Sequence, residues 1–112
     1  MRTASPDPTL LRNVQTRGVI ITARASSPTA DFVSRFFAPS VGIAEDSVTG
    51  SAHCCLGPYW QRYLGKADLV GIQVSRRGGV VHVQVEGDRV KLGGQAVTIL
   101  RADLAIVPLS GP

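Results

Sequence analysis

The sequence has few cysteines, few aromatic residues and no long apolar run. Cys54 and Cys55 are neighbours, so they cannot readily bridge each other and do not form a spaced zinc cluster; we expect reduced core thiols. No apolar run approaches the roughly 20 residues that span a bilayer, so no membrane association is expected. Residues 1–6 precede no apolar stretch typical of a secretory signal, which favours a cytoplasmic location.

The charge pattern also argues against a nucleic-acid partner. The formal net charge is +4, but the arginines are scattered from Arg2 to Arg101, and only Arg76 and Arg77 are adjacent. Aromatic residues make up 5% of the chain and do not alternate with basic residues as in a stacking platform for single strands.

The length of 112 residues predicts one core. Residues 1–16, which include Pro6 and Pro8, predict an irregular lead-in with room for a short helical turn. Residues 17–106 carry the predicted regular elements, and residues 107–112 are expected to form a tail.

Short β-branched or alternating segments predict six strands, bounded by turn residues such as those in 77–79 and 86–88. They cover residues 17–25, 31–37, 71–75, 80–85, 89–92 and 96–100, and a loop is expected over residues 42–50.

Residues 51–64 predict the one helix. Apolar residues recur at helical spacing, and Gly65 follows as a stop signal. Pro58 predicts either a kink or an early end of the first segment. The order of two strands, a helix and further strands excludes a regular βαβ alternation. It favours an α+β fold in which a curved mixed or antiparallel sheet wraps around one central helix.

The start of this helix carries the most informative motif. Its unpaired backbone N–H groups and partial positive charge favour an anion. Gly50 allows close approach to the backbone, Thr49 and Ser51 can donate hydroxyl hydrogen bonds, and Asp46 is a candidate proton carrier. The same residues are typical of ordinary helix capping, in which Asp46 adds a dipole interaction of under about 1 kcal/mol. From the residues alone, capping is the commoner explanation.

Residues 45–53 closely resemble the Glu-Asp-Pro-Val-Thr-Gly-Ser-Ala-His signature of PhzF-like proteins, the phenazine-biosynthesis isomerase family of the diaminopimelate-epimerase-like fold. The similarity continues through residues 17–23, 31–39, 75–79 and 94–98 and covers most of residues 17–104. It implies an enzyme of two similar halves with the reactive pocket between them. This chain resembles the carboxy-terminal half, because no stretch matches the general-base glutamate or the Cys-Gly-His-Ala helix start of the first half.

The resemblance implies roles for individual residues. Asp46 matches the second acidic site residue, and Gly50 and Ser51 match the pair that holds the substrate, with Thr49 beside them. Ser47 replaces the proline of the signature, which should loosen the loop. In cysteine-dependent epimerase relatives the reactive thiol falls where Thr49 stands, so Cys54 and Cys55 are not expected to be nucleophiles. No metal or organic cofactor is implied.

Two histidines lie outside this assignment. His53, one turn into the helix, is expected to be a hydrogen-bonded structural residue, and His82 lies in a strand without a partner motif.

The expected function is therefore half of a cofactor-independent isomerase that binds a small carboxylate substrate and is inactive alone. A rival interpretation is a non-catalytic assembly module that pairs with itself as a homodimer or with the missing amino-terminal half. The chain can also be a fragment of a longer reading frame. The sequence does not identify the substrate.

Overall fold

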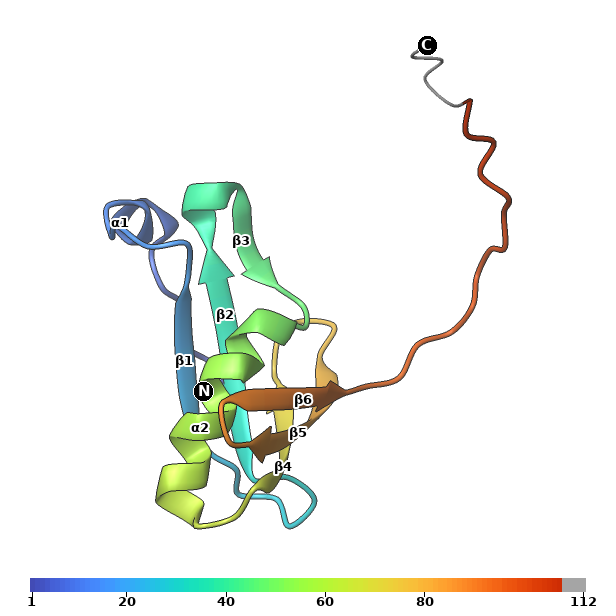
Figure 1. The fold of residues 1–112 in the computed structure, drawn as a ribbon. Coiled ribbons are helices and arrows are strands. Elements are labelled where there is room, and N and C mark those ends of the chain that lie inside the picture. The colour runs from blue at the N-terminus through green and yellow to red at the C-terminus, as the bar shows by residue number, and fades with distance from the viewer. Residues whose placement is uncertain (108–112) are drawn as a thin grey trace.

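A computed structural model of the chain describes residues 1–107 and shows a curved sheet packed against one long helix (Figure 1). The elements in chain order are α1 (Pro8–Arg12), β1 (Val19–Arg24), β2 (Phe32–Ala38), a 3-10 turn (Pro39–Val41), β3 (Ile43–Asp46), α2 (Gly50–Leu64), β4 (Asp68–Gln73), β5 (Gly79–Glu86) and β6 (Arg89–Gly93). The predicted α+β class, with a mixed sheet around one helix, is confirmed.

The sheet has six strands in the order β1-β2-β4-β5-β6, and β3 pairs with β2 beside this path. All neighbours are antiparallel except β2 and β4, which are parallel because α2 connects them as a crossover. Asp31 fixes the start of this parallel pair. Its amide donates to the Val70 carbonyl at 2.8 Å, and its carboxylate accepts from the Val70 amide at 2.7 Å.

The core lies between the concave face of the sheet and α2. Strand alternation places Phe32, Ser34 and Phe36 of β2 inside, and Val81, Val83 and Val85 of β5 line the same face. These side chains exclude water from the helix that crosses them, so burial of apolar area holds the two layers together.

Helix α2 buries one face against the sheet and ends at Gly65, whose φ of 67° supplies the predicted stop. Its buried residues are Ala52, His53, Leu56, Gly57 and Trp60. Gly57 permits close approach, since a Cβ there would lie 2.8 Å from Val83 Cγ1. The predicted tight turns are also present, with positive φ at Gly78 and Gly87.

The structure corrects two expectations about the helix. Pro58 does not end it early: α2 continues to Leu64. Pro58 and Cys54 are both exposed, so water can hydrate the Cys54 carbonyl that a proline four residues later leaves unpaired. The cysteines are free thiols, but they are exposed rather than in the core. The buried face of α2 uses residues 52, 53, 56, 57 and 60, which leaves positions 54 and 55 on the outer side.

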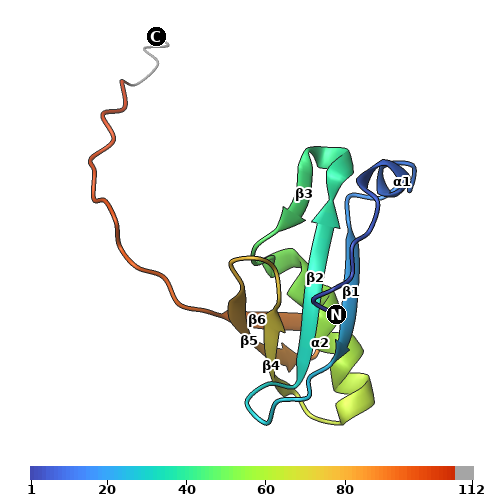
Figure 2. The same ribbon diagram turned by 180° about the vertical axis from the view of Figure 1, so that it is seen from behind.

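Two strand assignments also change. Residues 43–46, expected to be part of a loop, form β3, because the 3-10 turn and Gly42 (φ 86°) reverse the chain onto β2. The strand predicted over residues 96–100 is absent. Residues 94–107 leave the sheet after Gly93 and extend away from the domain without forming a helix or strand (Figures 1 and 2). Nothing within residues 1–93 covers their apolar side chains. Of the predicted tail, residues 108–112 lie outside the described part.

The lead-in contains the short helix α1, and residues 1–4 run beside β2, where the Arg35 guanidinium donates to the carbonyls of Met1, Arg2 and Ala4. Within residues 1–107, no helix combines the length and apolar character needed to traverse a bilayer.

Candidate functional site at the start of helix α2

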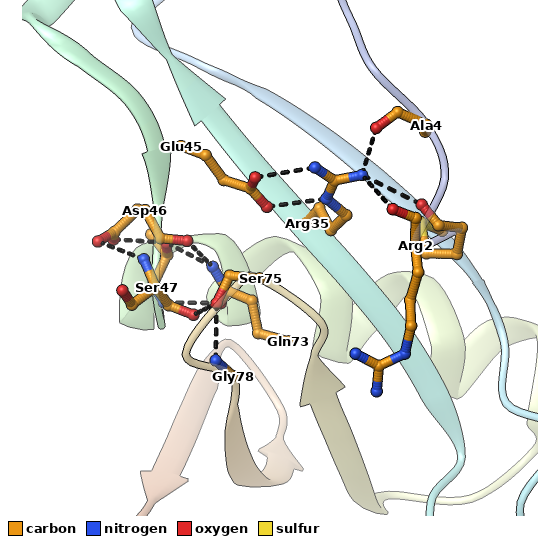
Figure 3. Close-up of polar contacts among 11 residues, drawn as sticks. Arg2, Ala4, Arg35, Glu45, Asp46, Ser47, Gln73, Ser75 and Gly78 are labelled. Carbon is orange, nitrogen blue, oxygen red and sulfur yellow. Dashed lines mark hydrogen bonds and ion pairs between the residues drawn. The ribbon is translucent and has the colours of Figure 1, made fainter.

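The loop before α2 is held in place by Gln73, the last residue of β4 (Figure 3). The fully buried Gln73 side chain accepts from the Thr49 amide at 2.7 Å and donates to the Asp46 carbonyl and the Thr49 hydroxyl oxygen, each at 3.0 Å. One amide side chain therefore ties both ends of residues 46–49 to the sheet, which fixes where α2 begins.

Asp46 lies at the end of β3, opposite Phe36 of β2, and is half-buried. Its carboxylate accepts from the Ser47 amide at 2.9 Å and from the Thr49 hydroxyl at 2.6 Å. The Thr49 hydroxyl proton is committed to this bond, so it is not available to a ligand in this arrangement. Asp46 and Thr49 are thus neighbours in the structure, and they are bonded to each other.

Ser47 occupies the position of the proline in the signature. The hydrogen bond from its amide to Asp46 is one that proline could not make. The Ser47 carbonyl accepts from the Ser75 hydroxyl at 2.7 Å, and Ser75 in turn accepts from the Gly78 amide at 3.0 Å (Figure 3). These bonds connect the loop to the β4–β5 turn and restrain it without a proline ring.

The first turn of α2 is open to solvent. Gly50 and Ser51 are exposed, and Thr49, at the N-cap position, makes no side-chain capping hydrogen bond. The Ser51 hydroxyl instead accepts from the Arg17 guanidinium at 3.1 Å. The start of the helix therefore combines uncapped amides with an arginine, both of which favour an anion.

Gly50 also lines an open groove of ≈ 700 Å³ between the start of α2 and the β4–β5 turn. The groove is bordered by Val48, Arg77, Gly78 and Gly79 on this side. Of the four predicted site residues, Gly50 alone contributes to this lining within the described chain; Asp46, Thr49 and Ser51 do not line the groove.

His53 is the structural residue that the sequence predicted. It is fully buried, and its Nδ1 lies 2.7 Å from the Thr49 carbonyl. A carbonyl can only accept, so Nδ1 carries the proton and Nε2 is bare, with no hydrogen-bond partner in residues 1–107. Burial lowers the pKa of His53, although the bond to Thr49 opposes this shift. His53 is therefore neutral near pH 7.

An ion pair supports β3 behind the loop. Arg35 makes a bidentate pair with Glu45, with both N–O distances at 2.8 Å, and the hydrogen bonds from this pair raise the pKa of Arg35 despite its desolvation. Within the described residues, no group of three or more His, Cys, Asp or Glu side chains is placed to hold a metal ion.

The sequence analysis did not identify the residues that hold the site in place from other parts of the chain. Gln73 could have been identified, because a single amide residue in the apolar segment 69–74 predicts a buried polar contact. Arg17 and the Arg35–Glu45 pair left none, since their partners are 34 and 10 residues away in the sequence.

The chain is similar to known proteins over most of its length. The family profile described as "Phenazine biosynthesis-like protein" matches residues 1–102. The chain is 49% identical over 106 residues to an uncharacterized isomerase of Halalkalibacterium halodurans, a match covering 95% of this chain and 40% of that protein. An uncharacterized isomerase of Pseudomonas aeruginosa is 50% identical over 99 residues, which cover 88% of this chain and 37% of that protein.

A crystal structure of a phenazine biosynthesis PhzC/PhzF protein from Clostridium difficile matches with a TM-score of 0.80 and 40% identity, covering 93% of this chain and 40% of that one. Residues 1–93 are 83% of the chain (93/112), so this match extends beyond β6 into residues 94–107 or further. The chain thus spans about two fifths of the length of these relatives.

Proposed function

Because the chain belongs to the family of phenazine biosynthesis-like proteins, we propose that it forms one half of an isomerase and binds the carboxylate of a small substrate at the start of α2. Two relatives are named isomerases, and the chain corresponds to about two fifths of each. The substrate site and the inactivity of this half alone are the parts of the proposal that require an experiment.

The observation that carries the proposal is the exposed first turn of α2. A 15-residue helix directs about half a positive elementary charge toward its start, and the Thr49 side chain does not occupy the amides there. Gly50 lines the groove and has no side chain to keep a ligand from the backbone. A carboxylate could accept hydrogen bonds from the amides at Gly50 and Ser51.

Two arginines strengthen the preference for an anion. Arg17 donates to the Ser51 hydroxyl, and Arg77, in the β4–β5 turn, lines the groove together with Gly50. Their charges favour a carboxylate over a neutral amide of the same shape, although exposure to water and salt limits each contribution to roughly 1 kcal/mol or less.

In the complete enzyme, a carboxylate base of the other half would remove a proton from a carbon next to an unsaturated or carbonyl group, and an acid would return it elsewhere. This half would hold the anionic end of the substrate so that the reacting carbon is aligned with that base. Asp46 would assist by orienting the loop and the substrate. Without the other half, we expect weak binding and no turnover.

An NMR titration of the 15N-labelled chain tests the anion site, with benzoate as the probe and benzamide as its neutral analogue. Benzoate should shift the amide signals of Gly50, Ser51 and Ala52, and benzamide should not. Gly50→Ala should weaken the effect without steric damage to the fold, because the new Cβ would lie 3.6 Å from its nearest neighbour, Leu92 Cδ1.

Arg77→Gln should weaken benzoate binding by roughly two- to fivefold, as expected for one exposed charge. Arg76→Gln is the matched control, because Arg76 is adjacent but does not line the groove. Equal responses to benzoate and benzamide, or shifts centred away from the start of α2, would remove the basis for a substrate site there.

A further inference from the structure

Arg35 joins two parts of the chain that lie far apart in sequence (Figure 3). Its Nε and Nη2 atoms donate to the two Glu45 carboxylate oxygens, each at 2.8 Å. Its Nη1 atom donates to the carbonyls of Met1, Arg2 and Ala4. In the described chain, every hydrogen bond that ties this first segment to the rest of the protein comes from that one nitrogen. The guanidinium is therefore a junction between the lead-in and β3.

The backbone pairing of β3 is weak, so a side-chain contact matters more there than on the other strands. β3 has four residues and pairs with β2 at two positions, Phe36 with Asp46 and Ala38 with Ile43, with an irregularity between them. β1, by comparison, pairs with β2 at six positions. Because side chains alternate between faces with a period of two, a slip of one residue in β3 would turn Asp46 to the other face of the sheet.

The bond between Arg35 and Glu45 opposes such a slip. Asp46 lies opposite Phe36, and partners of this kind project from the same face, which here is the concave face that packs against α2. Arg35 precedes Phe36 and therefore projects from the other face. Glu45 precedes Asp46 and projects the same way as Arg35. The bidentate bond holds Glu45 on that face, and strand alternation then directs Asp46 toward the Thr49 hydroxyl, which donates to it at 2.6 Å.

The junction is largely shielded from water. The side chains of Arg35 and Glu45 are 12% and 23% exposed, and the guanidinium carbon lies 4.9 Å from the centre of the buried Phe37 ring. The chain contains a contrasting ion pair between Lys91 and Glu86, whose side chains are 68% and 45% exposed and whose N–O distance is 3.3 Å. Water and salt screen such an exposed pair, whereas the two parallel bonds of Arg35 are charge-assisted and fix one geometry.

We propose that Arg35 is a positioning residue for Asp46, and that its guanidinium couples the docking of residues 1–4 to the direction of the Asp46 side chain. When residues 1–4 are in place, their carbonyls hold Nη1 and keep the guanidinium in the orientation that presents Nε and Nη2 to Glu45. When they leave, the Arg35 side chain gains freedom to rotate, and β3 loses its restraint. In the proposed complete enzyme, residues 1–4 lead in from the other half, so the guanidinium would connect that entry to Asp46; this last step rests on the proposed function.

Amide hydrogen exchange in the 112-residue chain tests the coupling without a ligand, so its result does not depend on the anion site. The reporter is the Ser47 amide, which donates to the Asp46 carboxylate at 2.9 Å and exchanges faster when that carboxylate turns away. Arg35→Met should accelerate exchange at Ser47 roughly tenfold, as expected for the loss of charge-assisted hydrogen bonds. Lys91→Met is the matched control, because it also removes an ion pair within the sheet but should leave exchange at Ser47 unchanged.

Two further changes separate the coupling from the charge of Arg35. Arg35→Lys keeps the charge but lacks the planar fork, so it should accelerate exchange at Ser47 nearly as much as Arg35→Met. Deletion of residues 2–4 perturbs the junction from its other end, because contacts to backbone carbonyls cannot be removed by changing side chains. The deletion leaves Arg35 and Glu45 in the sequence, yet exchange at Ser47 should rise roughly threefold.

Urea unfolding followed by Trp60 fluorescence distinguishes a local effect from global loss of stability. In each variant we expect exchange at Ser47 to rise more than exchange at the amides of α2 and β5. Wild-type protection of Ser47 in Arg35→Lys or in the deletion chain would overturn the proposal. An acceleration that is equal at all these amides and follows the unfolding midpoint would also overturn it. If Arg35→Met does not fold, Arg35→Lys and the deletion provide the test.

Discussion

Replacing Gln73 with leucine should destabilise the protein by about 3 kcal/mol. Leucine has a similar size but makes none of the three hydrogen bonds that hold residues 46–49. The Thr49 amide would remain buried without an acceptor, at a cost of about 1–3 kcal/mol, and each of the other two lost bonds would add about 1 kcal/mol. The added apolar contact offsets part of this sum. The loss is a large share of a typical stability of about 5–15 kcal/mol.

Urea denaturation followed by Trp60 fluorescence measures this change, because Trp60 packs in the core beside Phe32. The matched control is Gln84→Leu on β5, an exposed position where the change should stay within about 0.5 kcal/mol. Amide exchange at Thr49 should also accelerate in Gln73→Leu beyond the change at other α2 amides. Equal unfolding midpoints for the two variants would refute the idea that Gln73 organises the loop.

Gly71→Ala should lower the free energy of unfolding by about 3 kcal/mol in the same assay, because the new Cβ would lie 2.5 Å from Cζ of the buried Phe32. The control is Gly50→Ala, whose new Cβ would have no contact below 3.6 Å. A similar cost for both variants would contradict this reasoning. The lowered pKa of His53 makes stability depend on pH. The free energy of unfolding should be highest at pH values above the ordinary histidine pKa of about 6.5. It should fall as the pH drops through that value, because the unfolded state then binds more protons than the folded state. His53→Gln should flatten the pH dependence of the free energy of unfolding between pH 7 and 5. His82→Gln, at an exposed position, should leave it unchanged. An unchanged slope in His53→Gln would contradict the proposal that burial of His53 causes this dependence.

Most of the fold could be predicted from the sequence because its strands are short, β-branched and separated by glycine turns. Residues 80–85 were predicted as a strand, and in the structure the alternating Val81, Val83 and Val85 form its buried face. Gly65, Gly78 and Gly87 marked the ends of elements because each adopts the positive φ that other residues avoid.

The incorrect predictions have a common physical cause. The local sequence pattern does not show which distant residues a segment will contact in the folded chain. Residues 96–100 have a strand-like composition, but a strand forms only where another edge supplies hydrogen bonds. Residues 43–46 lack an apolar alternation, yet they form β3 because β2 is available to them. The cysteines look apolar, but the helical phase set by Ala52, Leu56 and Trp60 turns them outward.

The site was predictable in part. The motif at residues 45–53 located the loop and the start of α2, and in the structure Gly50 lines a groove. The motif could not show that Asp46 and Thr49 bond to each other, or that Gln73 comes from a strand 24 residues later to fix them. The substrate roles of Asp46, Thr49, Gly50 and Ser51 remain predictions.

The parallel pairing of β2 with β4 has a consequence for how quickly the chain reaches its native state. Phe32 lies opposite Gly71, so this register closes a loop of 39 residues (71 − 32) that contains the whole of α2. The β1–β2 and β4–β5–β6 hairpins join strands that are close in sequence and can form early. The β2–β4 contacts stabilise the chain only after the entropy of closing that loop has been lost. We expect the joining of these two antiparallel units to limit the folding rate, and until it occurs the edges of β2 and β4 are open to aggregation.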